Sequence, residues 1–223
     1  NKLRTFLSTL GIMIGIFCVI SVQMLVDSVE RSVKGSFSQL GENVVYIDRF
    51  PWNEDPSLNW WKYIKRPRPN YKEFKVLQER LQLADKVGIR IRVRNVEVKH
   101  KNNVISGTTI MPASHDFGDL LSVEMGMGRY FTNTESYLGG NVVIIGANVA
   151  DELFPTISFP IGNTIRVMGK EVRVIGVIKR EEASLLSEGF DNDIIVPFNL
   201  MRRYIDVNSG SLEPLIMVKA IDT

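Results

Sequence analysis

TFLSTLGIMIGIFCVISVQMLV, residues 5–26, carries no charged side chain, and this run decides how the rest of the chain is organised. At about 1.5 Å per helical residue, about 22 residues span the ~30 Å apolar core of a bilayer. A signal peptide has a shorter apolar stretch that ends in a small-residue cleavage site. Here Gln23 to Leu25 lead directly into Asp27. The run therefore predicts a retained transmembrane helix, and residues 1–26 form its segment.

The charges around this run indicate which side of the membrane the remainder occupies. Lys2 and Arg4 precede it, and Asp27 and Glu30 are the first charges after it. Because basic flanks stay on the cytoplasmic side, we expect residues from about 27 onward to lie outside the cytoplasm. The single cysteine, Cys18, lies inside the apolar run. A body without cysteine suits a bacterial periplasm, so we expect the inner membrane with the body in the periplasm.

An apolar stripe extends the helix beyond the membrane. It repeats every three or four residues and comprises Val26, Val29, Val33, Phe37 and Leu40. Such a stripe is typical of an amphipathic helix, and the glycine that follows is typical of a helix end. Two interpretations stay open: a helix packed on its own domain, or a stalk over residues 27–40 whose stripe contacts a partner helix. Within the membrane run, Gly11 and Gly15 form a G-x-x-x-G pattern that favours close helix packing.

The remaining residues predict an α+β body. Asn70 and Glu73 form a capping box before a helix whose buried face reaches Ala84. One strand is expected over residues 89–98, with a bulge near Asn95 and a solvated face made of Arg90, Arg92 and Arg94. Gly169 is placed for a tight hairpin turn. We expect two lobes: an α/β lobe from residues 41–112 and 190–223, with a β-rich lobe from residues 113–189 inserted in it.

Residues 51–69 form a stretch rich in tryptophan, proline and basic residues. Trp52, Trp60, Trp61 and Arg66 are its candidates for an interface. Aromatic and basic side chains together are typical of the headgroup region of a membrane or of a partner surface. The alternative is a loop that packs its tryptophans on its own sheet.

Searches for catalytic and cofactor motifs find no match. Gly169-Lys170 lacks the first glycine and the Ser/Thr of a phosphate-binding loop, and Gly146 lacks the further glycines of a dinucleotide turn. His100 and His115 are the only histidines, so zinc-type spacing is absent. The net charge of +2 gives no broad attraction to nucleic acid. The sequence thus predicts a non-enzymatic segment without a metal or cofactor of its own, and without a nucleic-acid partner.

Several short segments, taken in order, resemble one family. The opening NKLRTFLSTLGIMIGIFCVISV resembles the start of the MacB-type ABC transporter permeases, where Asn-Lys-Leu-Arg-Thr precedes a first transmembrane helix with Leu-Gly-Ile-x-Ile-Gly. The family's later motifs are matched at Gly128–Thr132, Val142–Phe154, Pro160–Ile165, Val174–Val177 and Asp193–Pro197. The resemblance covers nearly the whole chain apart from residues 51–69.

This resemblance implies an architecture and partners. It implies a four-helix permease with this body between its first and second membrane helices, built of a porter-like lobe and a "Sabre"-like lobe. It further implies a homodimer in membrane lipid, an ABC ATPase domain, fused or separate, that binds ATP-Mg, a periplasmic adaptor and an outer-membrane channel. In such a machine, ATP hydrolysis moves the stalk and the body, which is mechanotransmission. The implied function is efflux or export. The alternatives are a lipoprotein-extracting complex of the same architecture and a membrane-anchored extracytoplasmic sensor domain.

Overall fold

The computed structural model describes residues 2–39, 43–50, 61–63, 65–180, 189–207, 209, 212 and 214–221, with the backbone alone at residue 5 and at 31–39. These residues form one long helix and a mixed helix and strand body, which we describe separately. Helices and strands are thus combined as predicted for an α+β chain.

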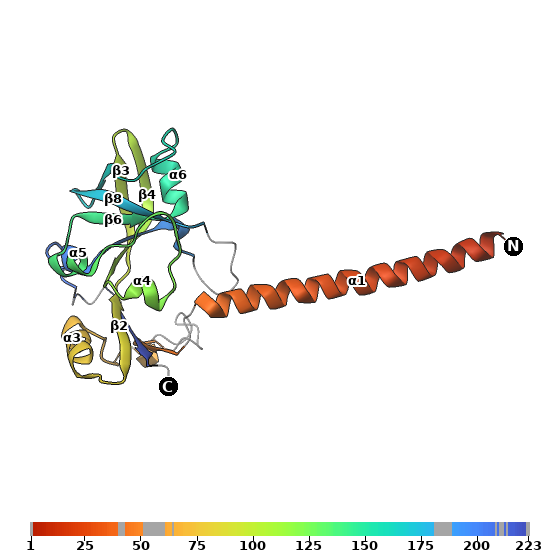
Figure 1. Ribbon diagram of the computed structural model, residues 1–223, viewed down its shortest axis with the longest axis horizontal. Helices are drawn as coiled ribbons and strands as arrows, with labels where there is room; N and C mark the ends of the chain where they lie inside the picture. The colour runs from red at the N-terminus through yellow and green to blue at the C-terminus, as the bar shows by residue number, and fades with distance from the viewer. Residues whose placement is uncertain are drawn as a thin grey trace. The chain divides into compact units, whose positions relative to one another are not determined.

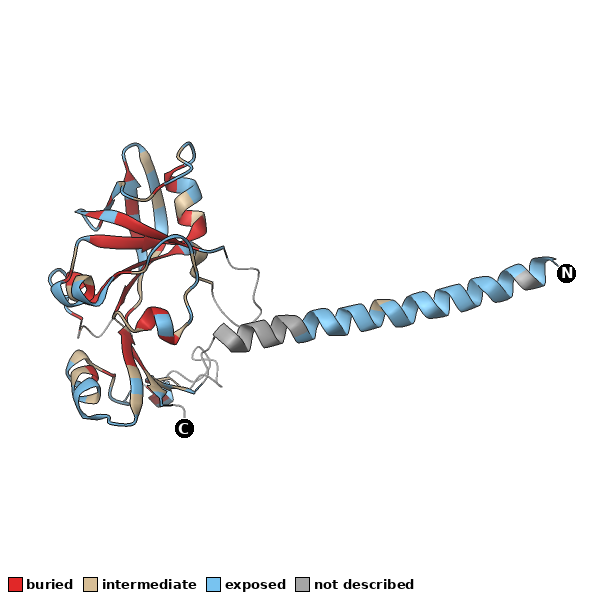
Figure 2. Ribbon diagram, viewed as in Figure 1, coloured by how far each residue is buried: buried red, intermediate tan, exposed pale blue. Residues whose placement is uncertain are grey.

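Helix α1 runs unbroken from Lys2 to Gln39, which at about 1.5 Å per residue is roughly 57 Å. Its described side chains are exposed apart from the half-buried Ser21, and Figure 2 shows the helix in the exposed colour along its described length. Residues 2–30 form a helix long and apolar enough to cross a membrane, and an 18-residue window within it has a mean hydropathy of 2.3. The predicted helix and its continuation past residue 26 are confirmed as one helix. The last residue of the predicted stalk, Leu40, lies outside the described residues.

The body contains, among the described residues, ten strands hydrogen-bonded into one sheet (Figure 1). Their order is β1-β10-β2-β4-β3-β7-β8-β6-β9, and β5 pairs with β8. The strands are β1 Val44–Ile47, β2 Ala84–Arg90, β3 Val93–His100, β4 Asn103–Ala113, β5 Met125–Gly128, β6 Val142–Ile145, β7 Thr164–Val167, β8 Lys170–Ile178, β9 Asp193–Pro197 and β10 Leu215–Ala220.

A parallel pairing between β4 and β9 closes part of this sheet into a ring. Thr109 to Ala113 pair with Asp193 to Pro197, so β4, β3, β7, β8, β6 and β9 follow one another back to β4. Strands closed in this way have no free edge, which removes a route to edge-to-edge association. The ring includes strands from both sides of residue 113 and both sides of residue 189, and the division into two lobes stays a prediction.

Short helices cover the body's apolar cores. They are α3 Tyr71–Arg80, α4 Phe117–Leu120, α5 Asn133–Leu138, α6 Ala147–Leu153 and α7 Phe198–Met201, with the 3₁₀ turn η1 Phe190–Asn192 before β9. Figure 1 shows α3 beside β2 and α6 beside β4. One core lies under α3 and contains Phe74, Ile89 and Ile216; the second contains Phe117, Phe131 and Ile144; the third, within the ring, contains Val98, Ile165 and Val174.

The predicted capping box, hairpin turn and bulge, each of which depends on only a few neighbouring residues, are confirmed. The side chain of Asn70 accepts the backbone N–H of Glu73, and the Glu73 carboxylate accepts the N–H of Asn70, which makes the capping box. Met168 and Gly169, with φ of 49° and 77°, form the two-residue turn between β7 and β8. Asn95 has a φ of 60°, at the bulge between Val93 and Val96.

Two element boundaries were wrong. The single strand expected over residues 89–98 is two strands, because β2 ends at Arg90 between β10 and β4, and β3 starts at Val93 and pairs with β7. The helix that begins after Asn70 ends at Arg80 with Leu81 as its cap, so Ala84 belongs to β2 and not to the helix's buried face.

Candidate functional site

The glycines of the membrane run lie on α1 with open space beside them. A Cβ atom built on Gly11 or on Gly15 meets no other atom within 4 Å. Without a side chain, these positions let a second helix approach the backbone closely. Their role in packing against neighbouring helices stays a prediction.

The predicted stalk contacts fall only partly within the described residues. Val29 lies on α1 and is 55% exposed. Val33 and Phe37 lie on the helical backbone, but their side chains lie outside the described residues, as does Leu40. The helical backbone therefore puts Val29, Val33 and Phe37 at a spacing of four, which keeps them on one side of α1.

The tryptophan-rich stretch contributes one described tryptophan. Trp61 lies in a helical turn that includes residues 61–63, and it is 56% exposed. Trp52 and Trp60 lie outside the described residues. Arg66 is exposed, and its guanidinium lies 4.5 Å from the centre of the Tyr63 ring. The structure therefore brings Arg66 beside an aromatic ring and leaves Trp61 accessible.

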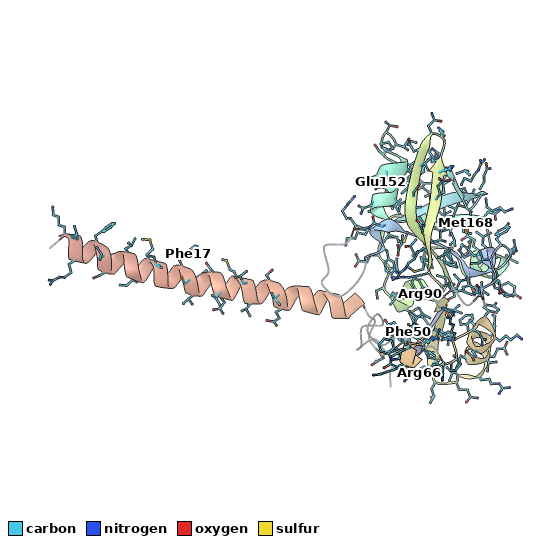
Figure 3. All side chains as sticks on the ribbon, turned by 180° about the vertical axis from the view of Figure 1, so that it is seen from behind. Phe17, Phe50, Arg66, Arg90, Glu152 and Met168 are labelled. Atoms are coloured by element: carbon cyan, nitrogen blue, oxygen red, sulfur yellow. The ribbon has the colours of Figure 1, made fainter. Side chains whose placement is uncertain are left out.

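A buried tyrosine fixes this segment to the body. Tyr63 is 8% exposed, and its carbonyl oxygen accepts a hydrogen bond of 2.8 Å from Nε of Arg49. The ring of Phe50 meets the Tyr63 ring edge-on at 6.2 Å, and Figure 3 shows Phe50 and Arg66 in the same part of the body. Sequence reasoning did not single out Arg49, although a basic residue next to Phe50 was visible at the end of the first strand.

The expected solvated arginine face was wrong at Arg90. Burial lowers the pKa of Arg90 to about 10, and the neighbouring cation Arg92 acts in the same direction. The carboxylates of Asp48 and Asp193 act in the opposite direction. Arg90 is the last residue of β2, paired on one side with Leu215 and on the other with Ala113 of β4, and it is half-buried between these neighbours. Alternation along a strand predicts which face a residue occupies, but not what covers that face.

The Gly-Arg-Tyr-Phe motif holds helix α5. Both guanidinium nitrogens of Arg129 bond to the carboxylate of Glu135 at 2.7 Å. Glu135 also completes a capping box with Thr132 at the start of α5. The Arg129 hydrogen bond is the main cause that lowers the pKa of Glu135 from 4.5 to about 2. Phe131 of the motif is fully buried. The motif's residues thus serve folding, and the Thr-x-x-Glu spacing could have revealed the cap.

The residues tested for nucleotide and metal chemistry also have structural contacts. A Cβ on Gly146 would overlap the carbonyl oxygens of Phe190 and Asp191, which leaves no space for a phosphate at this turn. His100 donates from Nδ1 to the carbonyl of Thr164, and His115 donates to the carbonyl of Phe131, each at 2.9 Å. Among the described residues, no group of three His, Cys, Asp or Glu side chains could hold a metal ion.

The surface hollows of the described body open to solvent. One of them has a volume of about 590 Å³ and lies between α5 and the β7–β8 hairpin, and another of about 410 Å³ lies beside His100. The described geometry thus defines a class: a folded extramembrane domain on a long apolar helix, whose motif residues make turns, caps and cores.

Comparison with known families gives this class a narrower identity. The sequence profile described as "MacB-like periplasmic core domain" matches residues 5–223. The chain therefore belongs to the MacB-like periplasmic core domain family, found in ABC transporter permeases, as its motifs predicted.

Curated relatives support the same family. The chain is 26% identical over 202 residues to the macrolide export ATP-binding/permease protein MacB of Nitrosomonas europaea, covering 91% of this chain and 29% of that protein. It is 26% identical over 190 residues to MacB of Escherichia coli K12, covering 82% and 27%. The chain thus spans less than a third of the length of the curated relatives it matches.

Solved structures show the same fold. The periplasmic region of MacB from Actinobacillus actinomycetemcomitans matches with a TM-score of 0.64 at 16% identity, covering 83% of this chain and 78% of that one. The extracellular domain of the noncanonic ABC-type transporter YknZ from Gram-positive bacteria matches with a TM-score of 0.59 at 19% identity, covering 81% and 85%.

Proposed function

We propose that this chain is the motion-transmitting, extracytoplasmic part of the permease of a MacB-like ABC transporter. Its family membership supports the permease context, and the names of its relatives join an ATP-binding part to a permease part. ATP-Mg is bound by the nucleotide-binding domain, fused or separate, and not by this chain. The parent protein crosses the bacterial inner membrane several times and holds the body in the periplasm.

One observation carries the mechanism: α1 is a single helix from Lys2 to Gln39. Its sequence contains no proline, so no residue interrupts the i to i−4 hydrogen-bond ladder that makes a helix stiff. A displacement at the membrane end is therefore carried to residue 39, four residues before the body's first described residue. Two copies pack α1 through Gly11, Gly15 and the stalk stripe, which makes the permease a homodimer.

The body serves as the docking end of this lever. Residues 41–112 and 190–223 form the porter-like lobe, and residues 113–189 form the inserted β-rich, Sabre-like lobe. Rigid, capped elements suit a part that must pass motion to other proteins without deforming, because packed interiors transmit displacement. We propose a periplasmic adaptor and an outer-membrane channel as the partners. Export is preferred over lipoprotein extraction because these relatives are named for macrolide export.

The experiment that tests this proposal separates ATP hydrolysis from export. Val33→Asp places a charge in the stalk stripe, and Val33→Leu is the matched control that keeps the position apolar. In the intact transporter, we expect the aspartate variant to hydrolyse ATP but to lose macrolide export, and the leucine variant to keep both. Unchanged export by the aspartate variant would contradict the proposal.

A further inference from the structure

Helix α7 is held by two of the body's apolar cores. Phe198 belongs to the core under α3, whereas Leu200 and Met201 belong to the core within the ring. The chain keeps a helical course to Ile205, whose N–H bonds to the carbonyl of Met201 at 3.0 Å, and Ile205 packs against both cores. The exposed side chains of this segment are therefore presented on a fixed support.

The side of the segment next to α3 carries two cations around a single aromatic ring. The guanidinium of Arg202 lies 4.0 Å from the centre of the Tyr71 ring. The ammonium of Lys75, one turn further along α3, lies 6.0 Å from the same centre. The Tyr71 ring stacks on the buried Phe198, with 5.3 Å between the ring centres. Both cations therefore lie beside a ring that the core holds in place.

The side next to α5 and the β7–β8 turn adds two more cations. Arg203 donates a hydrogen bond of 2.6 Å to the carbonyl of Leu138, at the end of α5. The ammonium of Lys170 lies 4.6 Å from the centre of the Tyr204 ring. Tyr204, Leu138 and Met168 are 45%, 59% and 43% exposed. Figure 1 shows α3 and α5 along one side of the body, and Figure 3, seen from behind, shows Met168 on that side.

These side chains make up what we call the α7 surface: Lys75, Lys170, Arg202, Arg203, Leu138, Met168 and Tyr204. Within the part of the chain that the structure describes, its four cations contact carbonyl or amide oxygens and aromatic rings, and none forms an ion pair. Glu171, next to Lys170 in the sequence, pairs with Arg166 instead. Asp206 is the nearest acidic residue after Arg203. Four cations and this one carboxylate leave the region with a net positive charge.

The composition of the α7 surface indicates what fits it. Arginine, tyrosine and methionine are enriched where proteins bind one another, and arginine and tyrosine contribute most per residue. A carboxylate is the complementary charge, and a basic surface that meets an acidic one speeds the encounter and disfavours like-charged partners. Cations that already lie over aromatic rings also lose less side-chain freedom on binding. An acidic segment with an apolar side chain therefore matches both the charge and the exposed apolar groups.

We propose that the α7 surface docks a segment of another periplasmic protein that carries several Asp or Glu side chains beside an apolar one. The proposal rests on the proposed function, in which the body is the docking end of the transporter, and it adds the chemistry of the docked segment. Because two packed cores hold α7, a displacement of the body is passed to the docked segment.

A photo-crosslinker in the surface identifies the docked segment. p-Benzoylphenylalanine in place of Tyr204 keeps an aromatic ring at an exposed position. The intact transporter carries this residue in membranes of cells that make its partners, and mass spectrometry after illumination reads the crosslinked peptide. We expect a peptide of another protein with several acidic residues. The crosslinking yield should fall as salt rises, because salt screens exposed charge pairs.

The charge-removing variant is Lys170→Gln with Arg202→Gln, which leaves the contact of Arg203 with α5 in place. Each exposed charge pair favours binding about two- to fivefold, so we expect the yield at low salt to fall roughly tenfold. The matched control, Arg94→Gln with Lys101→Gln, also removes one lysine and one arginine, and all four side chains are exposed. We expect the control to crosslink like the parental chain. Near-ultraviolet circular dichroism checks that both variants are folded.

Charge exchange tests the proposal with partner and surface together. Lys170→Glu with Arg202→Glu should abolish crosslinking, and lysine at the acidic positions of the crosslinked peptide should restore it. A peptide without acidic residues, or a yield that ignores salt and both charge changes, would overturn the proposal. So would the absence of a crosslinked protein, or crosslinks only to lipid or to another copy of this chain.

The stalk variant keeps this result separate from the proposed function. If Val33→Asp uncouples export from ATP hydrolysis but the crosslink is absent or indifferent to charge, the α7 surface proposal alone is wrong. If the crosslink depends on charge as expected and Val33→Asp still exports, the docking surface stands and the lever is wrong.

Discussion

Gly146 connects β6 to α6 at a point where the structure leaves no space for a side chain. A Cβ there would overlap the backbone carbonyl oxygens of Phe190 and Asp191, at separations that real Cβ atoms essentially never show. Gly146→Ala therefore tests whether the packing between this turn and η1 is as tight as described. The substitution adds one methyl group and changes no charge.

The expected cost follows from how firmly both sides of the contact are fixed. The N–H of Gly146 bonds to the carbonyl of Asp193 at 2.9 Å, and the Gly146 carbonyl accepts the N–H of Ala150 at 2.9 Å. On the other side, η1 leads directly into β9, which pairs with both β4 and β6. Relief requires backbone movement and weakens such hydrogen bonds, so we expect a loss of about 3 kcal/mol, at the upper end of overpacking costs.

The assay is urea unfolding of the detergent-solubilised chain, followed by near-ultraviolet circular dichroism. Helix α1 contains no tyrosine or tryptophan, so this signal reports the body. Gly140→Ala is the matched control, because the nearest atoms to its Cβ are at an ordinary 3.6 Å. We expect the control to lie within about 0.5 kcal/mol of the parental chain. Equal midpoints for the two alanine variants, with unchanged slopes, would refute the described packing at Gly146.

Two further predictions concern the helix caps. Glu135→Gln should lower the free energy of unfolding by about 1 kcal/mol at neutral pH, a value reduced because solvent surrounds the half-exposed Arg129. The pKa of Glu135 in the folded protein is lowered from 4.5 to about 2, so the stabilisation is present above about pH 4.5 and is lost as the pH falls toward 2. The unfolding curves of the variant and the parental chain should therefore converge in acid. A difference that persists at pH 2 would contradict the ion pair as its source. Asn70→Ala should cost about 1 kcal/mol and speed amide exchange in α3, and protection equal to that of the parental chain would show that the capping box contributes nothing.

Features encoded over a few residues could be predicted from the sequence. The capping box of Asn70 and Glu73 and the turn at Met168 and Gly169 depend on side chains and φ angles within four residues. The apolar helix could also be predicted, because an uncharged run of about 22 residues is typical of a membrane-spanning helix. Family membership followed from the order of several such local motifs.

Long-range contacts could not be predicted in this way. Nothing near Ile110 or Ile194 indicates that β4 and β9 pair in parallel and close a ring, because the short apolar runs at these residues do not specify a partner strand. For the same reason the burial of Arg90 was missed, as the pattern around it does not reveal which element covers its face. For the tryptophan-rich stretch at residues 51–69, the sequence indicated only that aromatic and basic residues occur together. The hydrogen bond from Arg49 to the carbonyl of Tyr63, which anchors this stretch, was found only in the folded structure.

The central claim is that α1 passes motion from the membrane to the body. Its most direct test is the amount of macrolide exported per ATP hydrolysed by the intact transporter carrying Val33→Asp, compared with Val33→Leu. We predict a ratio near zero for the aspartate variant at near-parental ATP hydrolysis, and a parental ratio for the leucine variant. A parental ratio in both variants would contradict the claim.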